Sequence, residues 1–248
     1  MAADDNENWE DRPLIMPFCG QSCWLVYQTL ERALGRSVII EPGLSWTLVR
    51  RQDPNMEHLA KITKCNTMVV LAEKLIEESF DPIVDRHTRN NMIQSVVYNC
   101  GSNFPRTNFS RFYTAILEND GRVISAASLR IPSPEIAEIP FIATSEAWRR
   151  KGMCRKLLEA IESALGDIGI KRIVIPSSTE MLAKWQIKFG FVNVDYQTNK
   201  NIKELNTLMF LKTTRLQKVI NPITRKTADL NFLPPSSPRL PPAPPSGQ

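Results

Sequence analysis

The sequence has few residues of the kinds that bind metals or form disulfide frameworks. Among its 248 residues there are five cysteines and two histidines. An odd number of irregularly spaced cysteines does not indicate a disulfide scaffold, so we expect a reducing compartment. The histidines, His58 and His87, do not form a ligand-spaced pair. Because a structural zinc ion needs four ligands, Cys19 and Cys23 could supply at most half a site, and we expect no metal.

Long apolar runs are also absent. No stretch approaches the roughly 20 apolar residues that a membrane-spanning helix needs, so we expect no membrane association. Residues 1–18 have no apolar signal core and are predicted to be disordered or loosely docked. The formal net charge of +5 favours anionic partners such as a phosphorylated ligand or chromatin. It is too small to establish direct binding to nucleic acid.

What is present is ordinary globular composition, with 42% hydrophobic and 23% charged residues. Apolar spacing predicts helices at residues 24–34, 56–79, 90–97, 153–165 and 179–188. Residues 67–70 are less helical, which leaves open a kink or two segments. Strands are predicted at residues 109–117, 122–131, 136–143, 172–175, 191–196 and 205–211. Residues 43–50 are predicted to be a connector.

The predicted topology is a mixed sheet with helices on its faces, an α/β (α+β) fold. Glu118-Asn119-Asp120-Gly121 favours a tight hairpin turn. The apolar strand at 172–175 lies between two predicted helices, which favours parallel pairing with the central strand at 136–143. The proline-rich residues 233–248 cannot build a core and are predicted to be disordered. They could bind an SH3- or WW-type domain as a polyproline helix.

The strongest chemical signal lies in residues 138–158, EIPFIATSEAWRRKGMCRKLL. A buried strand, a basic loop containing Gly152 and an amphipathic helix follow one another. The first turn of a helix has unpaired N–H donors and a partial positive charge, and glycine allows close approach of a ligand. The added cations are Arg149, Arg150, Lys151 and Arg155. This arrangement predicts a phosphate site.

The same stretch resembles the acetyl-CoA-binding motif of the GNAT acetyltransferase superfamily, Arg/Gln-x-x-Gly-x-Gly/Ala. It stands as Arg149-x-x-Gly152-x-Cys154, in which Cys154 is a departure that keeps a small side chain. The interval from Glu138 to Arg149 matches that family too. Further phrases are similar to plant nuclear proteins that join a PHD finger to a GNAT domain: GLSWTLVRR, FDPIVDRHTRNNMIQSVVYNCGSNF, FYTAILE, AEIPFIAT, RRKGMCRKLLEAIESAL and KFGF. The resemblance covers roughly residues 19–216.

The resemblance implies a GNAT fold, with a mostly antiparallel sheet, a helical N-terminal extension and a disordered proline-rich tail. The implied division is a disordered segment at 1–18, a PHD-finger remnant with a connector helix at 19–55, a GNAT domain at 56–216 and a tail at 217–248. In this interpretation Cys19 and Cys23 resemble the last ligands of a PHD finger whose earlier part is missing.

The resemblance also implies site residues. Glu138 corresponds to the catalytic glutamate, and burial in an apolar strand could raise its pKa toward that of a general base. A glutamate that faces solvent or pairs with an arginine is the alternative, and Glu118 and Glu135 are weaker candidates. The implied acetyl-CoA contacts are Ile142, Ala143 and Thr144 for the pantetheine, Arg149, Arg150, Lys151, Gly152, Met153, Cys154 and Arg155 for the pyrophosphate, and Trp185 near the thiol. Core packing is an equal alternative for Trp185.

Oxyanion donors are implied at the backbone amides of residues 141–143. Cys154 is expected to be a small helix residue, because a nucleophilic cysteine needs a histidine partner and none is close in sequence.

The implied function is an acetyl-CoA-dependent N-acetyltransferase acting on protein lysine, above all histone, in the nucleus. A histone tail and subunits of a chromatin complex are the expected partners. A catalytically weak or inactive GNAT-shaped chromatin interaction module is one alternative, favoured by Cys154 and the incomplete finger. A small-amine acetyltransferase is another.

Overall fold

The computed structural model describes residues 19–54 and 56–220, so the predictions for residues 1–18 and 233–248 lie outside it. The helices are α1 (Gln21–Ala33), α2 (Leu59–Glu77), α3 (Met92–Val97), α4 (Met153–Asp167), α5 (Leu182–Phe189) and α6 (Tyr196–Glu204). The strands are β1 (Ser37–Glu41), β2 (Leu44–Val49), β3 (Tyr113–Asn119), β4 (Arg122–Ser133), β5 (Ile136–Glu138), β6 (Ile142–Thr144), β7 (Arg172–Ser178), β8 (Val192–Asn193) and β9 (Thr213–Val219). The long helix α2 runs without the kink considered above.

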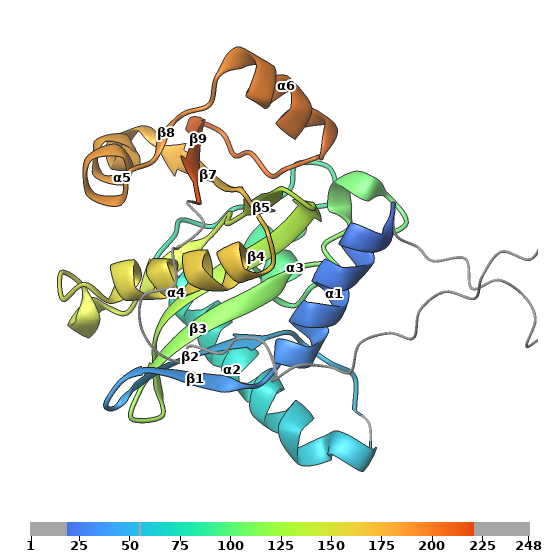
Figure 1. Cartoon of the computed structure of the whole chain (residues 1–248), viewed down its shortest axis with the longest axis vertical. Helices are drawn as coiled ribbons and strands as arrows, with labels where there is room; N and C mark the ends of the chain where they lie inside the picture. Colours follow the sequence, from blue (N-terminus) through green and yellow to red (C-terminus); the bar gives the residue numbers. More distant parts are fainter. Residues whose placement is uncertain (1–18, 55, 221–248) are drawn as a thin grey trace, which may run out of the picture.

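One sheet organises the chain, in the order β1-β2-β3-β4-β5-β7-β9-β8, with β6 paired to β4. Strands β5 and β7 are parallel, as predicted, and the other pairs are antiparallel. Helices α1 and α4 cover one face, and α2 and α3 cover the other (Figure 1). Each face is a hydrophobic cluster because successive strand residues point to opposite sides. Ala115 and Leu117 belong to the α4 side, whereas Ile116 belongs to the α2 side.

The predicted hairpin joins β3 to β4. Asp120 and Gly121 adopt φ values of 47° and 77°, the left-handed pair that a type I′ turn requires. The turn fixes the register of β4, on which the candidate site is built.

The connector predicted at residues 43–50 is wrong. These residues form β2, which pairs with β1 on one side and with β3 along its whole length on the other. Leu44, Trp46 and Leu48 alternate as a strand requires, and all three are buried. The sheet therefore extends N-terminal to residue 56, where we predicted the GNAT domain to begin.

The C-terminal pairing also differs from the prediction. Residues 205–211 do not form a strand, and β9 lies further along, so that the predicted domain end at residue 216 falls inside it. Helix α6 was not predicted, because Ile202 is its one buried residue and leaves no apolar periodicity. Its N-terminus is capped by Asp195, whose carboxylate accepts a hydrogen bond of 2.8 Å from the Thr198 amide.

We predict that Trp46→Ala lowers the free energy of unfolding by about 3–5 kcal/mol, since it opens a cavity in the core. Trp46 is 4% exposed, whereas Ile39 on the neighbouring strand β1 is 72% exposed, so Ile39→Ala is the matched control and should change little. Urea unfolding followed by far-UV circular dichroism measures both. Equal effects of the two substitutions would show that the N-terminal hairpin is not part of the core.

Candidate functional site

The central strand predicted at residues 136–143 is interrupted, and the sheet divides at the interruption. Strand β5 pairs with both β4 and β7, and the last bond to β7 runs from the Ile139 amide to the Val174 carbonyl at 3.0 Å. Beyond it the Phe141 amide donates to the Ser128 hydroxyl at 3.1 Å. Strand β6 then pairs with β4 alone, while β7 continues beside β9.

The division leaves one edge of β6 without a partner strand in the described ranges. The Phe141 carbonyl and the Ser145 amide form hydrogen bonds with β4. They show which alternate residues of this segment direct their main-chain groups toward β4. The main-chain groups of the intervening residues Ile142 and Thr144 therefore face the open edge. The Thr144 carbonyl accepts from Arg149 Nε at 3.1 Å.

Glu138 ends β5, directly beside this division. Its side chain is 2% exposed. Oε1 accepts from Arg130, which stands opposite it on β4, and Oε2 accepts from the Leu208 amide at 2.9 Å. The glutamate is thus both buried, as predicted, and paired with an arginine, as the alternative proposed.

Burial raises the pKa of the Glu138 carboxyl above its ordinary value. The Arg130 guanidinium, the Leu208 amide and the more distant charge of Arg215 oppose that rise. A carboxylate with a raised pKa that still has a cationic partner can exchange a proton, which is the property a general base needs.

A segment between α6 and β9 covers Glu138. The Asn206 carbonyl accepts from Arg130 at 2.9 Å, and the Asn206 side chain donates to the Pro105 carbonyl at 3.0 Å. Phe210 stacks on Phe141 with ring centroids 5.2 Å apart. Of the apolar residues that suggested a strand at 205–211, Leu208 and Phe210 thus pack beside the site, whereas Met209 and Leu211 are exposed.

The loop after β6 reaches the N-terminus of α4 through Gly152. Gly152 has φ 82°, a left-handed conformation that side chains disfavour, and a Cβ built there meets no atom within 4 Å. No side chain caps this helix. The first intrahelical bond runs from the Lys156 amide to the Gly152 carbonyl, so the amides of residues 153–155 precede it and have no partner within the helix.

The side chains of the cations predicted in this loop do not all point toward a common ligand position. Arg149 bridges the Thr144 carbonyl and the Ser79 hydroxyl, the latter at 3.3 Å, and so joins the loop to the end of α2. Arg155 donates to the Lys188 carbonyl at 2.6 Å on α5. Arg150 and Lys151 are exposed, with the Lys151 ammonium 5.3 Å from the Trp148 ring centroid.

The side chains of Met153 and Cys154 pack toward the core, so only their amides are available to a ligand at the helix terminus. Burial raises the pKa of the Cys154 thiol to about 11. The thiol is therefore protonated at neutral pH, which agrees with the expectation that it is not a nucleophile.

Trp185 lies in an aromatic cluster. Its ring centroid is 4.8 Å from that of Phe189 and 5.3 Å from that of Phe191, and the residue is buried. These contacts are the ones expected if Trp185 packs into the core. A contact with the thiol end of acetyl-CoA stays a prediction.

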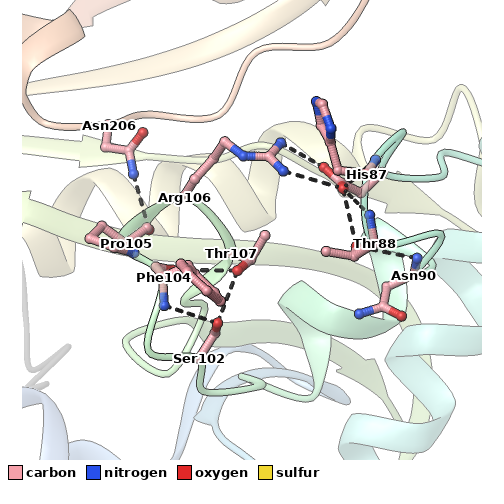
Figure 2. A network of polar contacts seen from close by, with 10 residues as sticks. His87, Thr88, Asn90, Ser102, Phe104, Pro105, Arg106, Thr107 and Asn206 are labelled. Atoms are coloured by element: carbon pink, nitrogen blue, oxygen red, sulfur yellow. Dashed lines mark hydrogen bonds and ion pairs between the residues drawn. The ribbon is translucent and has the colours of Figure 1, made fainter.

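A second polar network holds the neighbouring loops in place (Figure 2). The Asp85 carboxylate accepts from the amides of His87 and Thr88, from the Thr88 hydroxyl and from Arg106 at 2.7 Å. Arg106 precedes Thr107 and follows Pro105, whose carbonyl accepts from Asn206. The Arg106 contact holds the pKa of Asp85 well below its usual range. The network therefore anchors the segment that covers Glu138.

A family model described as the C-terminal domain of Increased DNA methylation 1 matches residues 80–219. The chain belongs to this family. Increased DNA methylation 1 of Arabidopsis thaliana is 38% identical to it over 216 residues, which are 84% of this chain. The match covers 18% of the Arabidopsis protein, so the chain spans less than a fifth of that relative's length.

The structure of Tetrahymena GCN5 is similar in fold to this member of the Increased DNA methylation 1 C-terminal domain family. It aligns with a TM-score of 0.51 and 14% identity, over 64% of this chain and 91% of the Tetrahymena chain. The predicted GNAT fold, a mostly antiparallel sheet flanked by helices, is thereby confirmed.

Sequence reasoning missed Arg130, Ser79 and the covering segment in this family member. Arg130 interrupts an apolar strand, which was the available signal, but its meaning depends on the register that sets it opposite Glu138. Ser79 and Leu208 are far from the motif in sequence, and nothing local marks them.

The sulfur atoms of Cys19 and Cys23 lie 2.6 Å apart. No group of three or more potential metal ligands occurs in residues 19–54 and 56–220, and no helix there is long and apolar enough to cross a membrane. The absence of a metal stays a prediction.

We predict that Asp85→Asn lowers the unfolding temperature at pH 7, and that the difference from the wild type shrinks as the pH falls below about 4. A carboxyl with a depressed pKa stabilises the fold only while it is ionised, so its contribution disappears on acidification. Thermal unfolding between pH 3 and 7 measures this. Asp53→Asn, which removes an exposed ion pair with Arg51, is the control. A difference that is constant with pH would contradict the assignment.

Proposed function

We propose that this chain is an acetyl-CoA-dependent N-acetyltransferase acting on protein lysine, most fittingly on histones, with Glu138 as general base. The observation that carries the proposal is the position of Glu138. A buried carboxylate with a raised pKa lies where the sheet divides, and β6 connects it to the uncapped N-terminus of α4.

The residues present fit acetyl-CoA. The open main-chain edge at Ile142 and Thr144 would bind the amides of the pantetheine arm as an added strand does. The free amides at the start of α4, with Arg150 and Lys151, would bind the pyrophosphate. The open space at Gly152 lets a phosphate approach the backbone.

The chemistry of acetyl transfer explains the need for a base. A lysine with pKa about 10.4 is protonated near pH 7.4, and removing the proton costs roughly 4 kcal/mol, or three units at about 1.36 kcal/mol each. Glu138 takes this proton, directly or through water. The amine nitrogen then bonds to the acetyl carbonyl carbon and the carbon–sulfur bond breaks. The second proton that the nitrogen loses ends on the sulfur, which leaves as a thiol.

The oxyanion that forms at the acetyl carbonyl needs a donor. The Phe141 amide is engaged by Ser128, and the main chain of Ala143 points to β4. Of the three amides expected from the sequence, that of Ile142 alone faces the open edge, so we assign this donor role to Ile142.

The name of the Arabidopsis relative supports a chromatin-related role and the nucleus as the place of action. The substrate, partners and localisation of this chain are accordingly part of the proposal. The wild-type chain should bind histone tails or subunits of a chromatin complex.

We predict that Gly152→Ala weakens coenzyme A binding at least about tenfold, equivalent to roughly 1.4 kcal/mol, because the added methyl group fills the space that the phosphate needs. Gly121→Ala is the matched control, since Gly121 also has a left-handed φ and open space around its Cα. Both substitutions should cost about 1–2 kcal/mol of stability from the backbone conformation. Isothermal titration calorimetry with coenzyme A measures the affinities, and unchanged binding by Gly152→Ala would contradict the phosphate site.

A second candidate function is a catalytically inactive interaction module. The enclosed state of Glu138 favours it, because both carboxylate oxygens are engaged within the protein. A small-amine acetyltransferase, considered from the sequence, has no comparable structural support.

We predict that Glu138→Gln lowers acetyl transfer onto core histones by about 10²–10⁴-fold, because the amide cannot take the proton. Labelled acetyl-CoA and mixed histones measure the rate. Glu135→Gln is the control, since Glu135 forms an exposed ion pair with Lys171 and should not matter.

The outcomes of this experiment separate the candidates. Equal labelling by the wild type and Glu138→Gln would support the acetyltransferase activity and exclude Glu138 as its general base. Coenzyme A binding without labelling of any histone would favour the interaction module. Acetylation of polyamines but not of histones would select the small-amine enzyme.

A further inference from the structure

Arg130 is the direct partner of the proposed base. It stands opposite Glu138 in the β4–β5 register, and both its Nε and a terminal nitrogen contact Glu138 Oε1. The guanidinium also lies 4.8 Å from the Phe112 ring centroid and donates to the Asn206 carbonyl at 2.9 Å. Its side chain is 11% exposed. These contacts hold the guanidinium between Glu138, Phe112 and Asn206.

Two cations act on Glu138, from two elements. Arg130 on β4 touches the carboxylate, whereas Arg215 on β9 acts through space. Arg215 is instead held by the Asn199 side chain at 2.7 Å and the Thr207 hydroxyl at 2.9 Å. Arg130 therefore has the larger electrostatic and geometric influence on the carboxylate.

The two oxygens of Glu138 are not equivalent. Oε1 is held by a side chain that belongs to the sheet, and β4 cannot withdraw without breaking the core. Oε2 is held by the Leu208 amide, which belongs to a segment without helix or strand between α6 and β9. Only the second contact can be exchanged for a contact with another molecule.

We propose that Arg130 is a positioning residue for the reaction proposed above: it fixes Glu138 through Oε1 and thereby reserves Oε2 for the N–H of the acceptor amine. The inference rests on the proposed function. The Leu208 amide, 2.9 Å from Oε2, marks where that N–H lies during proton transfer. The acceptor therefore enters from the side of residues 206–210 and displaces this contact.

The Arg130 guanidinium lowers the pKa of Glu138 relative to what burial alone would give. Burial alone favours the neutral acid, and an adjacent cation favours the carboxylate. Without Arg130 the carboxyl would gain a proton at a higher pH and lose its capacity as a base. A residue that served the fold alone would leave the pH dependence of the reaction unchanged once the variant is folded.

We predict that Arg130→Gln moves the acidic limb of the pH profile of kcat/KM upward by about 1–3 pH units, the size expected from loss of an adjacent cation. Acetyl transfer to a histone peptide between pH 5 and 9 measures it. Arg215→Gln is the matched control: it removes the nearby cation that does not touch Glu138, so its shift has the same direction and is smaller.

Arg130→Lys is a second variant that still tests the inference when Arg130→Gln does not fold. Lysine keeps the charge but loses the two-nitrogen contact, so the acidic limb should stay close to that of the wild type while kcat falls. The affinity for coenzyme A should be unchanged in both variants and checks their fold.

The outcomes distinguish this inference from the proposed function. An inactive wild type refutes the function and the inference with it. An active wild type with folded Arg130 variants of unchanged pH profile and unchanged kcat refutes the inference alone. An upward shift in Arg130→Gln together with a lowered kcat in Arg130→Lys supports it.

Discussion

The division of the sheet after Glu138 is the constraint on which the site depends. Among the described residues, strand β5 has a partner strand on both sides, and β6 has one. The Ser128 hydroxyl makes the change possible, because it bonds to the Phe141 amide where the regular ladder is interrupted. An unpaired buried amide would cost about 1–3 kcal/mol, so this bond stabilises the interruption. The exposed main-chain edge, the position of Glu138 and the approach to α4 all follow from it.

Much of this fold could be predicted from local pattern. The turn at Asp120-Gly121, the amphipathic α4 and the parallel pairing of β5 with β7 each have a signal within a few residues. The basic loop around Gly152 was found for the same reason, since the sequence there combines glycine, cations and a helix start. The prediction of β2 failed although Leu44, Trp46 and Leu48 alternate, because so short a run is easily assigned to a connector.

The rest depends on contacts that sequence order does not carry. Arg130 becomes the partner of Glu138 only through the β4–β5 register, and Leu208 reaches Oε2 from 70 residues further along the chain. Residues 205–211 are apolar enough to suggest a strand, but Leu208 and Phe210 pack beside the site and no strand forms. Single-residue signals such as Ile202 in α6 are too weak to predict a helix. Local periodicity thus predicts elements, whereas the surroundings of a buried charge come from tertiary structure.

The enclosed carboxylate has a consequence for the chemistry of water. A thioester held beside an exposed general base would be open to hydrolysis, and acetyl groups would be lost without transfer. While the Leu208 amide donates to Oε2 and Arg130 donates to Oε1, both carboxylate oxygens of Glu138 are engaged within the protein, which weakens their ability to activate a water molecule. In the reaction proposed above, Glu138 therefore becomes fully available as a base when an acceptor takes the place of Leu208, which limits the loss of acetyl groups to water.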